Sequence, residues 1–292
     1  MHGSLPTEII DPMSKKKEFS EAVDHINEIY PNIAVLAQLS TLLKEPDTDL
    51  EDVARLIRSE AALTADVIKV SNSSFYGSTV PCSNIEDALA RIGFSEVLKV
   101  VALILAKELT SNDLEKYGMS ADDFWRESLT VSLLMEELAA IIRLNKAEAA
   151  TLGIMHNIGR VIINNILELF RIDLYWDVSI PVVGWERTVV GFHYGEAGGR
   201  FLKRMKFPPE TQEAIQYHVE PESAPEEDRL TYLLHYCVEL SKRLGKGFAN
   251  FESSITDTPT PSMLDLSEDD IGAAIKNAAD RFNQLDKEVF SQ

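Results

Sequence analysis

The stretch Gly153-Ile154-Met155-His156-Asn157-Ile158-Gly159-Arg160 joins two apolar helical segments and carries the only recognisable site chemistry in the chain. A histidine followed directly by an acid at a helix end offers a neutral nitrogen and an anionic oxygen, a pairing that suits a catalytic divalent cation. Here the acid is replaced by Asn157, whose side chain offers only a neutral carbonyl oxygen. The stretch therefore predicts a helix junction built like a metal site that lacks one of its charges.

The length and composition permit a sizeable core. The chain has 292 residues, of which 45% are hydrophobic, enough for two domains or one domain with two lobes. The longest apolar run, residues 100–106, is too short to span a membrane and predicts a buried helix. Residues 1–17 lack the apolar stretch of a secretory signal, so we expect a cytoplasmic protein. Cys82 and Cys237 lack metal-type spacing and are expected to be buried free thiols.

The charge balance argues against a polyanionic partner. The chain has 47 acidic and 28 basic residues, a formal net charge of −19, and its longest basic run is Lys15-Lys16-Lys17. A protein of this charge repels nucleic acid and anionic membrane surfaces unless its bases gather on one face, and no such gathering is visible in the sequence. We therefore expect neither nucleic acid nor a membrane as the partner.

Helical periodicity recurs along the chain. Apolar residues at intervals of three and four, such as Ile33, Leu36 and Leu39, are typical of a helix packed on one face. No segment shows the convincing alternation that is typical of a strand. Capping residues precede several of the apolar segments, and the predicted caps are Thr48 or Asp49, Ser83 with Glu86, Ser95, Ser120 with Asp123, Asn145 with Glu148, and Ser267 with Asp270. Period and caps together predict an all-α fold.

We expect these helices to form two packed lobes that share a long interface, because the run 100–106 is apolar on all sides and needs cover from both directions. The predicted segments are a disordered N-terminal arm at residues 1–15, an N-terminal lobe at 16–112, and a C-terminal lobe at 113–292 that contains a loop at 246–262 and a final helix at 267–290.

Two groups of motifs resemble a known family. The stretch Asn72-Ser73-Ser74-Phe75-Tyr76-Gly77, followed by Ser83-Asn84-Ile85-Glu86-Asp87-Ala88 and Ile92-Gly93, resembles the signature of the HDOD family, helical output domains of bacterial signalling. The stretches 124–129 and 153–160 resemble the HD-type half of that fold. The resemblance covers roughly residues 30 to 240, and it implies an HD-like multi-helix fold with a role in signal transduction.

The resemblance also implies where a metal site would lie. HD-type phosphohydrolases hold metal through a first histidine, a His-Asp pair, later histidines and a final aspartate. The positions that would carry this pattern, most of them altered here, are Glu127, His156, Asn157, Tyr194 and Val238. His193 and His218 stand at the later histidine motifs. No acid stands at either expected aspartate position, so the resemblance implies a degenerate metal site.

Each candidate residue also has a structural interpretation. His156, His193 and His218 are either hydrogen-bonded histidines that join helices or metal ligands. Glu127 is expected to face His156 and to serve as its hydrogen-bond or ion-pair partner rather than as a ligand. Asn72 is expected to fasten a turn through its side chain. No catalytic residue is assigned.

The preferred hypothesis is therefore a non-catalytic regulatory protein that works through protein or ligand binding, with a signalling or regulatory protein as partner and no cofactor. The alternative is a divergent metal-dependent phosphohydrolase with a rearranged mononuclear site of one carboxylate and three imidazoles, drawn from Glu127, His156, His193 and His218. A nucleotide-binding sensor without turnover is a third hypothesis. The sequence leaves open the identity of the partner, the input signal and the oligomeric state.

Overall fold

The computed structural model describes residues 15–25, 33–73, 76, 80–94, 96–109, 112–245 and 262–285. In these ranges the regular structure is helical, and the only β-type pairing is one isolated bridge between Leu114 and Met119. The predicted all-α fold is therefore confirmed. Most of the predicted arm, the Ser95 cap, most of the predicted loop and the end of the predicted final helix lie outside the described residues.

The helices are, in chain order, α1 (Lys16–His25), α2 (Ile33–Leu42), α3 (Leu50–Arg58), α4 (Ala61–Ser71), α5 (Ile85–Ile92), α6 (Val97–Leu109), α7 (Ala121–Ile141), α8 (Lys146–Met155), α9 (Ile158–Leu169), α10 (Val182–Val189), α11 (Tyr194–Arg204), α12 (Pro209–Tyr217), α13 (Arg229–Leu244) and α14 (Glu268–Leu285). Short 3-10 helices occur at Glu115–Tyr117, Pro221–Ser223 and Ser262–Leu264. No helix in the described ranges is both long enough and apolar enough to cross a membrane.

Most predicted caps lie where the sequence places them. The side chains of Asp49, Ser120 and Asn145 each accept a hydrogen bond from a backbone N–H in the first turn of α3, α7 and α8. The cap predicted at Ser83 is wrong by one residue. Asn84 caps α5 instead, because its extended backbone brings Oδ1 within 2.8 Å of the Asp87 N–H.

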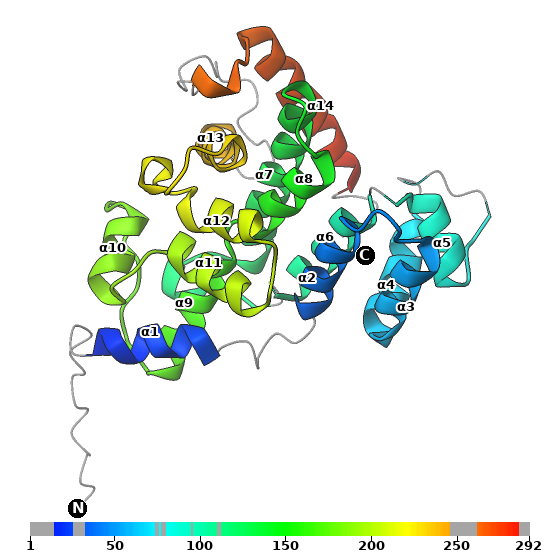
Figure 1. The fold of residues 1–292 in the computed structure, drawn as a ribbon. Helices are drawn as coiled ribbons and strands as arrows, with labels where there is room; N and C mark the ends of the chain where they lie inside the picture. The colour runs from blue at the N-terminus through cyan, green and yellow to red at the C-terminus, as the bar shows by residue number, and fades with distance from the viewer. Residues whose placement is uncertain are drawn as a thin grey trace, which may run out of the picture.

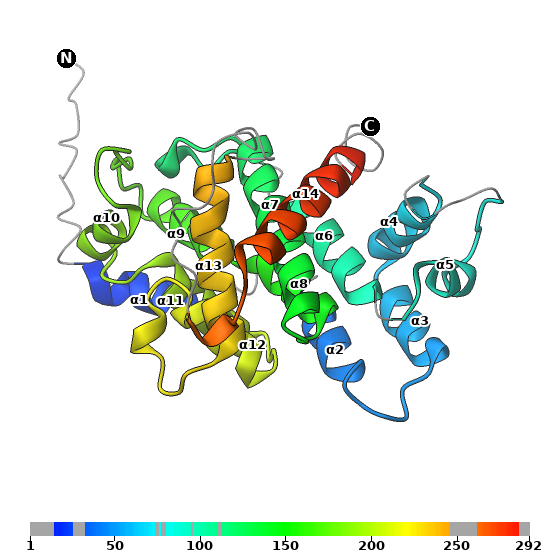
Figure 2. The same cartoon turned by 90° about the horizontal axis from the view of Figure 1, so that it is seen from above.

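The long helix α7 and its neighbour α8 run through the middle of the molecule (Figures 1 and 2). Helices α3, α4 and α5 lie together at one end, and α1 and α10 lie at the other. Helix α6 contacts α2 and α4 on the N-terminal side, and α7 and α8 on the C-terminal side. All residues of the run 100–106 are buried, as predicted from its apolar surface.

The boundary between the two predicted lobes stays a prediction. Helix α1, which the sequence division places in the N-terminal lobe, packs against α9 and α11 of the C-terminal lobe. Phe19 meets Phe170 edge-on with ring centroids 5.1 Å apart, and Arg200 Nη1 donates to Ser20 Oγ at 2.9 Å. One continuous hydrophobic core joins all of these helices.

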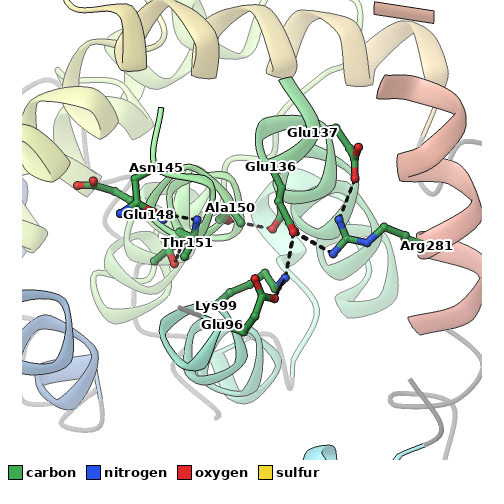
Figure 3. A network of polar contacts seen from close by, with 11 residues as sticks. Glu96, Lys99, Glu136, Glu137, Asn145, Glu148, Ala150, Thr151 and Arg281 are labelled. Atoms are coloured by element: carbon green, nitrogen blue, oxygen red, sulfur yellow. Dashed lines mark hydrogen bonds and ion pairs between the residues drawn. The ribbon is translucent and has the colours of Figure 1, made fainter. Parts of the chain in front are cut away.

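A buried ionic network links α6, α7 and α14 (Figure 3). Lys99 Nζ lies 3.1 Å from Glu136 Oε2, and it also pairs with Glu96. Arg281 Nη2 lies 3.0 Å from Glu136 Oε1, while its Nη1 lies 2.9 Å from Glu137 Oε1. The side chains of Lys99 and Glu136 are only 3% and 7% exposed, so each buried charge requires its partner.

Asn72, at the start of the first family-like motif, joins two parts of the chain through its side chain. Asn72 Nδ2 donates to the Cys82 carbonyl at 2.9 Å, and the Cys82 N–H donates to Asn72 Oδ1 at 2.8 Å. Arg91 Nη1 donates to the same Oδ1 at 2.9 Å. The turn-fastening role predicted for Asn72 is confirmed. Cys82 and Cys237 are both buried and free, also as predicted.

Candidate functional site

Two glycines set the position of the His-Asn junction between α8 and α9. A Cβ on Gly153 would lie 2.5 Å from the backbone Cα of Ser132, and one on Gly159 would lie 1.8 Å from the Tyr194 carbonyl oxygen. Only glycine permits such close approach, so α8 packs tightly on α7, and α9 on α11. The junction residues His156 and Asn157 are thereby buried among these helices.

The tautomers of two buried histidines follow from their hydrogen bonds. His156 Nδ1 lies 2.7 Å from the Gly153 carbonyl oxygen, and His218 Nδ1 lies 2.7 Å from that of Ile215. A carbonyl oxygen only accepts, so each Nδ1 carries a proton, and in a neutral ring the Nε2 then presents a lone pair. Neither Nε2 has a hydrogen-bond partner among the described residues, and the ring centroids lie 6.0 Å apart. Burial lowers the pKa of His218 well below its usual value, which favours the neutral ring.

Glu127 faces His156, as expected, but its closer partner is Arg160. The Arg160 Nη1 donates to Glu127 Oε1 at 3.2 Å, whereas His156 Nε2 lies 3.9 Å from that oxygen. Burial alone would raise the pKa of Glu127, but the positive charge of Arg160 holds it well below the usual range. The guanidinium also lies over the Tyr194 ring, 4.6 Å from its centroid. Arg160 therefore supplies a permanent positive charge to this centre.

A second buried carboxylate, Glu186, also interacts electrostatically with Arg160. Its Oε1 accepts from the Tyr117 hydroxyl at 2.8 Å, and its Oε2 accepts from the Tyr194 N–H at 2.8 Å. Burial raises its pKa to about 7, although Arg160 and the two hydrogen bonds oppose the shift. Sequence reasoning missed the role of this acid because its partner Tyr117 is 69 residues away.

His193 does not join the other histidines. Its ring caps α11, with Nδ1 accepting from the Gly195 N–H at 3.1 Å and the Glu196 N–H at 3.3 Å. The His193 N–H donates to Glu196 Oε2 at 2.8 Å, which completes a capping box. Val238 is buried on α13 and has no ligand atom in its side chain. The Asn157 amide is buried and has no hydrogen-bond partner among the described residues.

The residues present do not fit a catalytic divalent cation. Within the described ranges, no three His, Cys, Asp or Glu side chains converge as metal ligands would. The nearest carboxylate, Glu127, is paired with a guanidinium that would repel a second cation, and the Asn157 side chain carries no charge. The structure brings Glu127, His156 and His218 together, and it leaves His193 in a different role.

An open cleft of about 990 Å³ reaches this centre from the surface. It lies between the N-terminal half of α7, the segment 176–182 before α10, and the end of α13. Glu127 and Arg160 line its inner part, while His156 and His218 do not line it. The cleft therefore gives a ligand access to the ion pair but not directly to the two histidines.

The fold of the described residues defines an HD-like helical protein, which carries a His-Asn pair at the junction of α8 and α9. The family model described as the HDOD domain matches residues 30–221, and the chain belongs to the HDOD domain family. The predicted family is therefore confirmed.

Solved structures share this fold. An HDOD domain protein of unknown function from Geobacter sulfurreducens is 20% identical, with a TM-score of 0.67 and coverage of 88% of this chain and 92% of that one. A candidate signal transduction protein from Marinobacter aquaeolei is 18% identical, with a TM-score of 0.66, covering 94% of this chain and 65% of that one. A candidate metal-dependent phosphohydrolase from Shewanella amazonensis is 22% identical, with a TM-score of 0.54, covering 85% and 90%.

A curated relative from Treponema pallidum, described only as an uncharacterized protein, is 24% identical over 235 residues. The match covers 76% of this chain and 44% of the relative, so the chain spans less than half of that protein's length. At these identities the likeness to solved structures establishes the fold alone and does not establish the activity.

Proposed function

We propose that this chain is a non-catalytic regulatory HDOD module, which takes part in signal transduction by binding a protein or a ligand. The observation that carries the proposal is the ion pair between Arg160 and Glu127 at the degenerate centre, with Nη1 and Oε1 3.2 Å apart. The Arg160 guanidinium neutralises the charge of Glu127, as a bound metal cation would. A guanidinium cannot acidify a bound water as a metal ion does.

The rest of the centre supports the same proposal. Asn157 removes the anionic oxygen of the His-Asp pair, and the His193 ring is occupied in capping α11. A hydrolytic centre needs a polarising cation or an activated nucleophile. The Tyr117 hydroxyl, which donates to the Glu186 carboxylate here, has a pKa that burial and Glu186 raise well above its usual value, and this disfavours its ionised, nucleophilic form. A bacterial, cytoplasmic setting with a signalling or regulatory protein as partner is part of this proposal.

One observation favours the alternative, a divergent metal-dependent phosphohydrolase. Histidines that bind metal almost always donate their other ring nitrogen to a carbonyl or carboxylate. His156 and His218 both do so, and both keep a buried Nε2 without a hydrogen-bond partner among the described residues. Two imidazoles with this arrangement are the part of a metal site that the chain retains.

Hydrolysis assays distinguish the two functions. The full chain, supplied in turn with Mn²⁺, Fe²⁺ and Zn²⁺, should hydrolyse neither phosphomonoesters nor cyclic nucleotides. Turnover that is lost in His156→Ala would establish the phosphohydrolase instead. His193→Asn is the matched control, because asparagine also caps helices and the substitution removes an imidazole that caps α11. Loss of turnover in His156→Ala alone would place the metal at His156 rather than at His193.

A further inference from the structure

The cleft beside the degenerate centre has one apolar wall that is held in place. Trp176, Ile180 and Val182 line it on the side of the segment before α10. The Trp176 N–H donates to the Lys116 carbonyl at 2.7 Å, and its indole Nε1 donates to the Ile180 carbonyl at 3.0 Å. Because both donors are engaged, the indole is already ordered, and stacking a flat ligand against it costs little additional entropy.

The inner part of the cleft presents a donor and an acceptor side by side. Arg160 Nη1 and Glu127 Oε1 lie 3.2 Å apart, and both residues line the cleft. The Arg160 guanidinium has five N–H groups, and Glu127 Oε1 accepts from its Nη1, so the guanidinium retains donor capacity. A ligand edge with an acceptor next to an N–H donor would complement this pair, as base edges complement paired polar groups in nucleic-acid recognition.

The charges that line the cleft balance. Asp123 and Glu127 are acidic, Arg160 and Lys242 are basic, and Lys242 is paired with Glu239. The whole chain carries a formal charge of −19, so a ligand with several phosphates would be repelled on approach and would find no surplus cation in the cleft. The lining therefore favours a ligand without net charge.

We propose that the cleft binds an uncharged, planar nitrogen heterocycle whose edge places an acceptor beside an N–H donor, of which purine nucleosides are the common representatives. The ring would stack on Trp176, and its edge would meet Arg160 and Glu127. The cleft volume of about 990 Å³ suits such a molecule together with its ribose. This inference rests on the proposed function, since it assigns a ligand to a binding module that does not turn it over.

Titration calorimetry of the full chain with guanosine, adenosine, purine riboside and GTP tests the inference. Purine riboside lacks the N–H donor and the exocyclic group. Guanosine or adenosine should bind at least about tenfold more tightly than purine riboside, because a site built to pair with a donor rejects the analogue that lacks it. GTP should bind more weakly than guanosine. Equal binding of purine riboside, tighter binding of GTP, or no nucleoside binding would each overturn the proposal.

Variants at the wall test the stacking contact. Trp176→Leu should weaken nucleoside binding by about tenfold, while Trp176→Phe, which keeps a flat ring, should lose less. Tyr175→Leu is the matched control, because Tyr175 is adjacent, aromatic and 55% exposed and does not line the cleft. Equal loss in the Leu and Phe variants, or loss in the control, would overturn the placement on Trp176. If no nucleoside binds and GTP is not hydrolysed, only this inference is refuted. If GTP is hydrolysed, the proposed function is refuted.

Discussion

Replacing Arg160 tests whether the centre at the His156-Asn157 junction balances its own charge. Methionine keeps an apolar stem over the Tyr194 ring and removes the guanidinium. At 3.2 Å from Glu127, the guanidinium contributes about 5 kcal/mol of Coulomb attraction at an effective dielectric constant near 20, before its own desolvation cost is subtracted. Breaking a buried pair costs about 3–5 kcal/mol, so we expect Arg160→Met to destabilise the fold by about 3 kcal/mol near pH 7.

Urea unfolding of the full chain measures this loss, and a double-mutant cycle assigns it to the pair. Glu127→Gln removes the other charge, so the double variant should cost at least about 1.5 kcal/mol less than the sum of the two single variants. Arg187→Met is the matched control, because Arg187 pairs with Glu220 at the surface and should contribute about 1 kcal/mol or less. Additivity of the Arg160 and Glu127 variants within about 0.5 kcal/mol would refute the reasoning.

The pH dependence of the same cycle has a defined sign. The pKa of Glu127 is lowered in the folded protein, so the stability that it contributes is present above the usual carboxyl pKa. That stability is lost as the pH falls and the carboxylate takes up a proton. The difference between wild type and Glu127→Gln should therefore shrink as the pH falls below about 4, where the unfolded carboxyl group takes up a proton while the folded carboxylate still holds its charge.

Three further predictions concern other parts of the fold. The pKa of Glu186 is raised to about 7 from 4.5, which favours its protonated form, so wild-type stability should fall by about 3 kcal/mol as the pH rises through this interval. Glu186→Gln should remove most of this slope in urea titrations at pH 5 and 8, and an unchanged slope would contradict it. Lys99→Met leaves Glu136 short of one partner and should cost about 2 kcal/mol in urea unfolding; a change below about 0.5 kcal/mol would mean that the network does not stabilise the interface. Gly159→Ala, whose Cβ would lie 1.8 Å from a backbone oxygen, should cost at least about 3 kcal/mol in thermal unfolding, while Gly184→Ala, with open space around its Cβ, should change stability by less than about 1 kcal/mol.

The helices could be predicted because their signals are local. Caps such as Ser120 and Asn145 lie within three residues of the N–H groups that they accept from, so a short window of sequence contains the whole interaction. The error at α5 has the same origin. Ser83 and Asn84 are both good caps with an acid three residues on, and the sequence does not say which backbone is extended.

The capping role of His193 has a local signal in the sequence. Glu196 follows it by three residues, which is the spacing of a capping box, and the structure uses it in that way. Histidine is an uncommon cap, and the resemblance to metal-binding proteins predicts a ligand role for its ring nitrogens instead. The spacing was therefore available, but the chemistry expected of the residue type concealed it.

The partners of Arg160 and Glu186 could not be predicted from spacing. Glu127 lies 33 residues from Arg160, and Tyr117 lies 69 residues from Glu186, so only the packed fold reveals either contact. Arg160 stands inside the very stretch that suggested a metal site. Its charge became informative only when its distance to Glu127 was known, because a cation in that place competes with a metal rather than assisting it.

The measurement that tests the central claim most directly is the metal content of the full chain after equilibration with Zn²⁺, Mn²⁺ and Fe²⁺ and removal of the free ions. If Arg160 balances Glu127, the protein should retain less than stoichiometric metal, and His156→Ala should retain the same amount as wild type. One tightly held metal ion per chain, lost in His156→Ala, would contradict an internally balanced centre and would favour the phosphohydrolase.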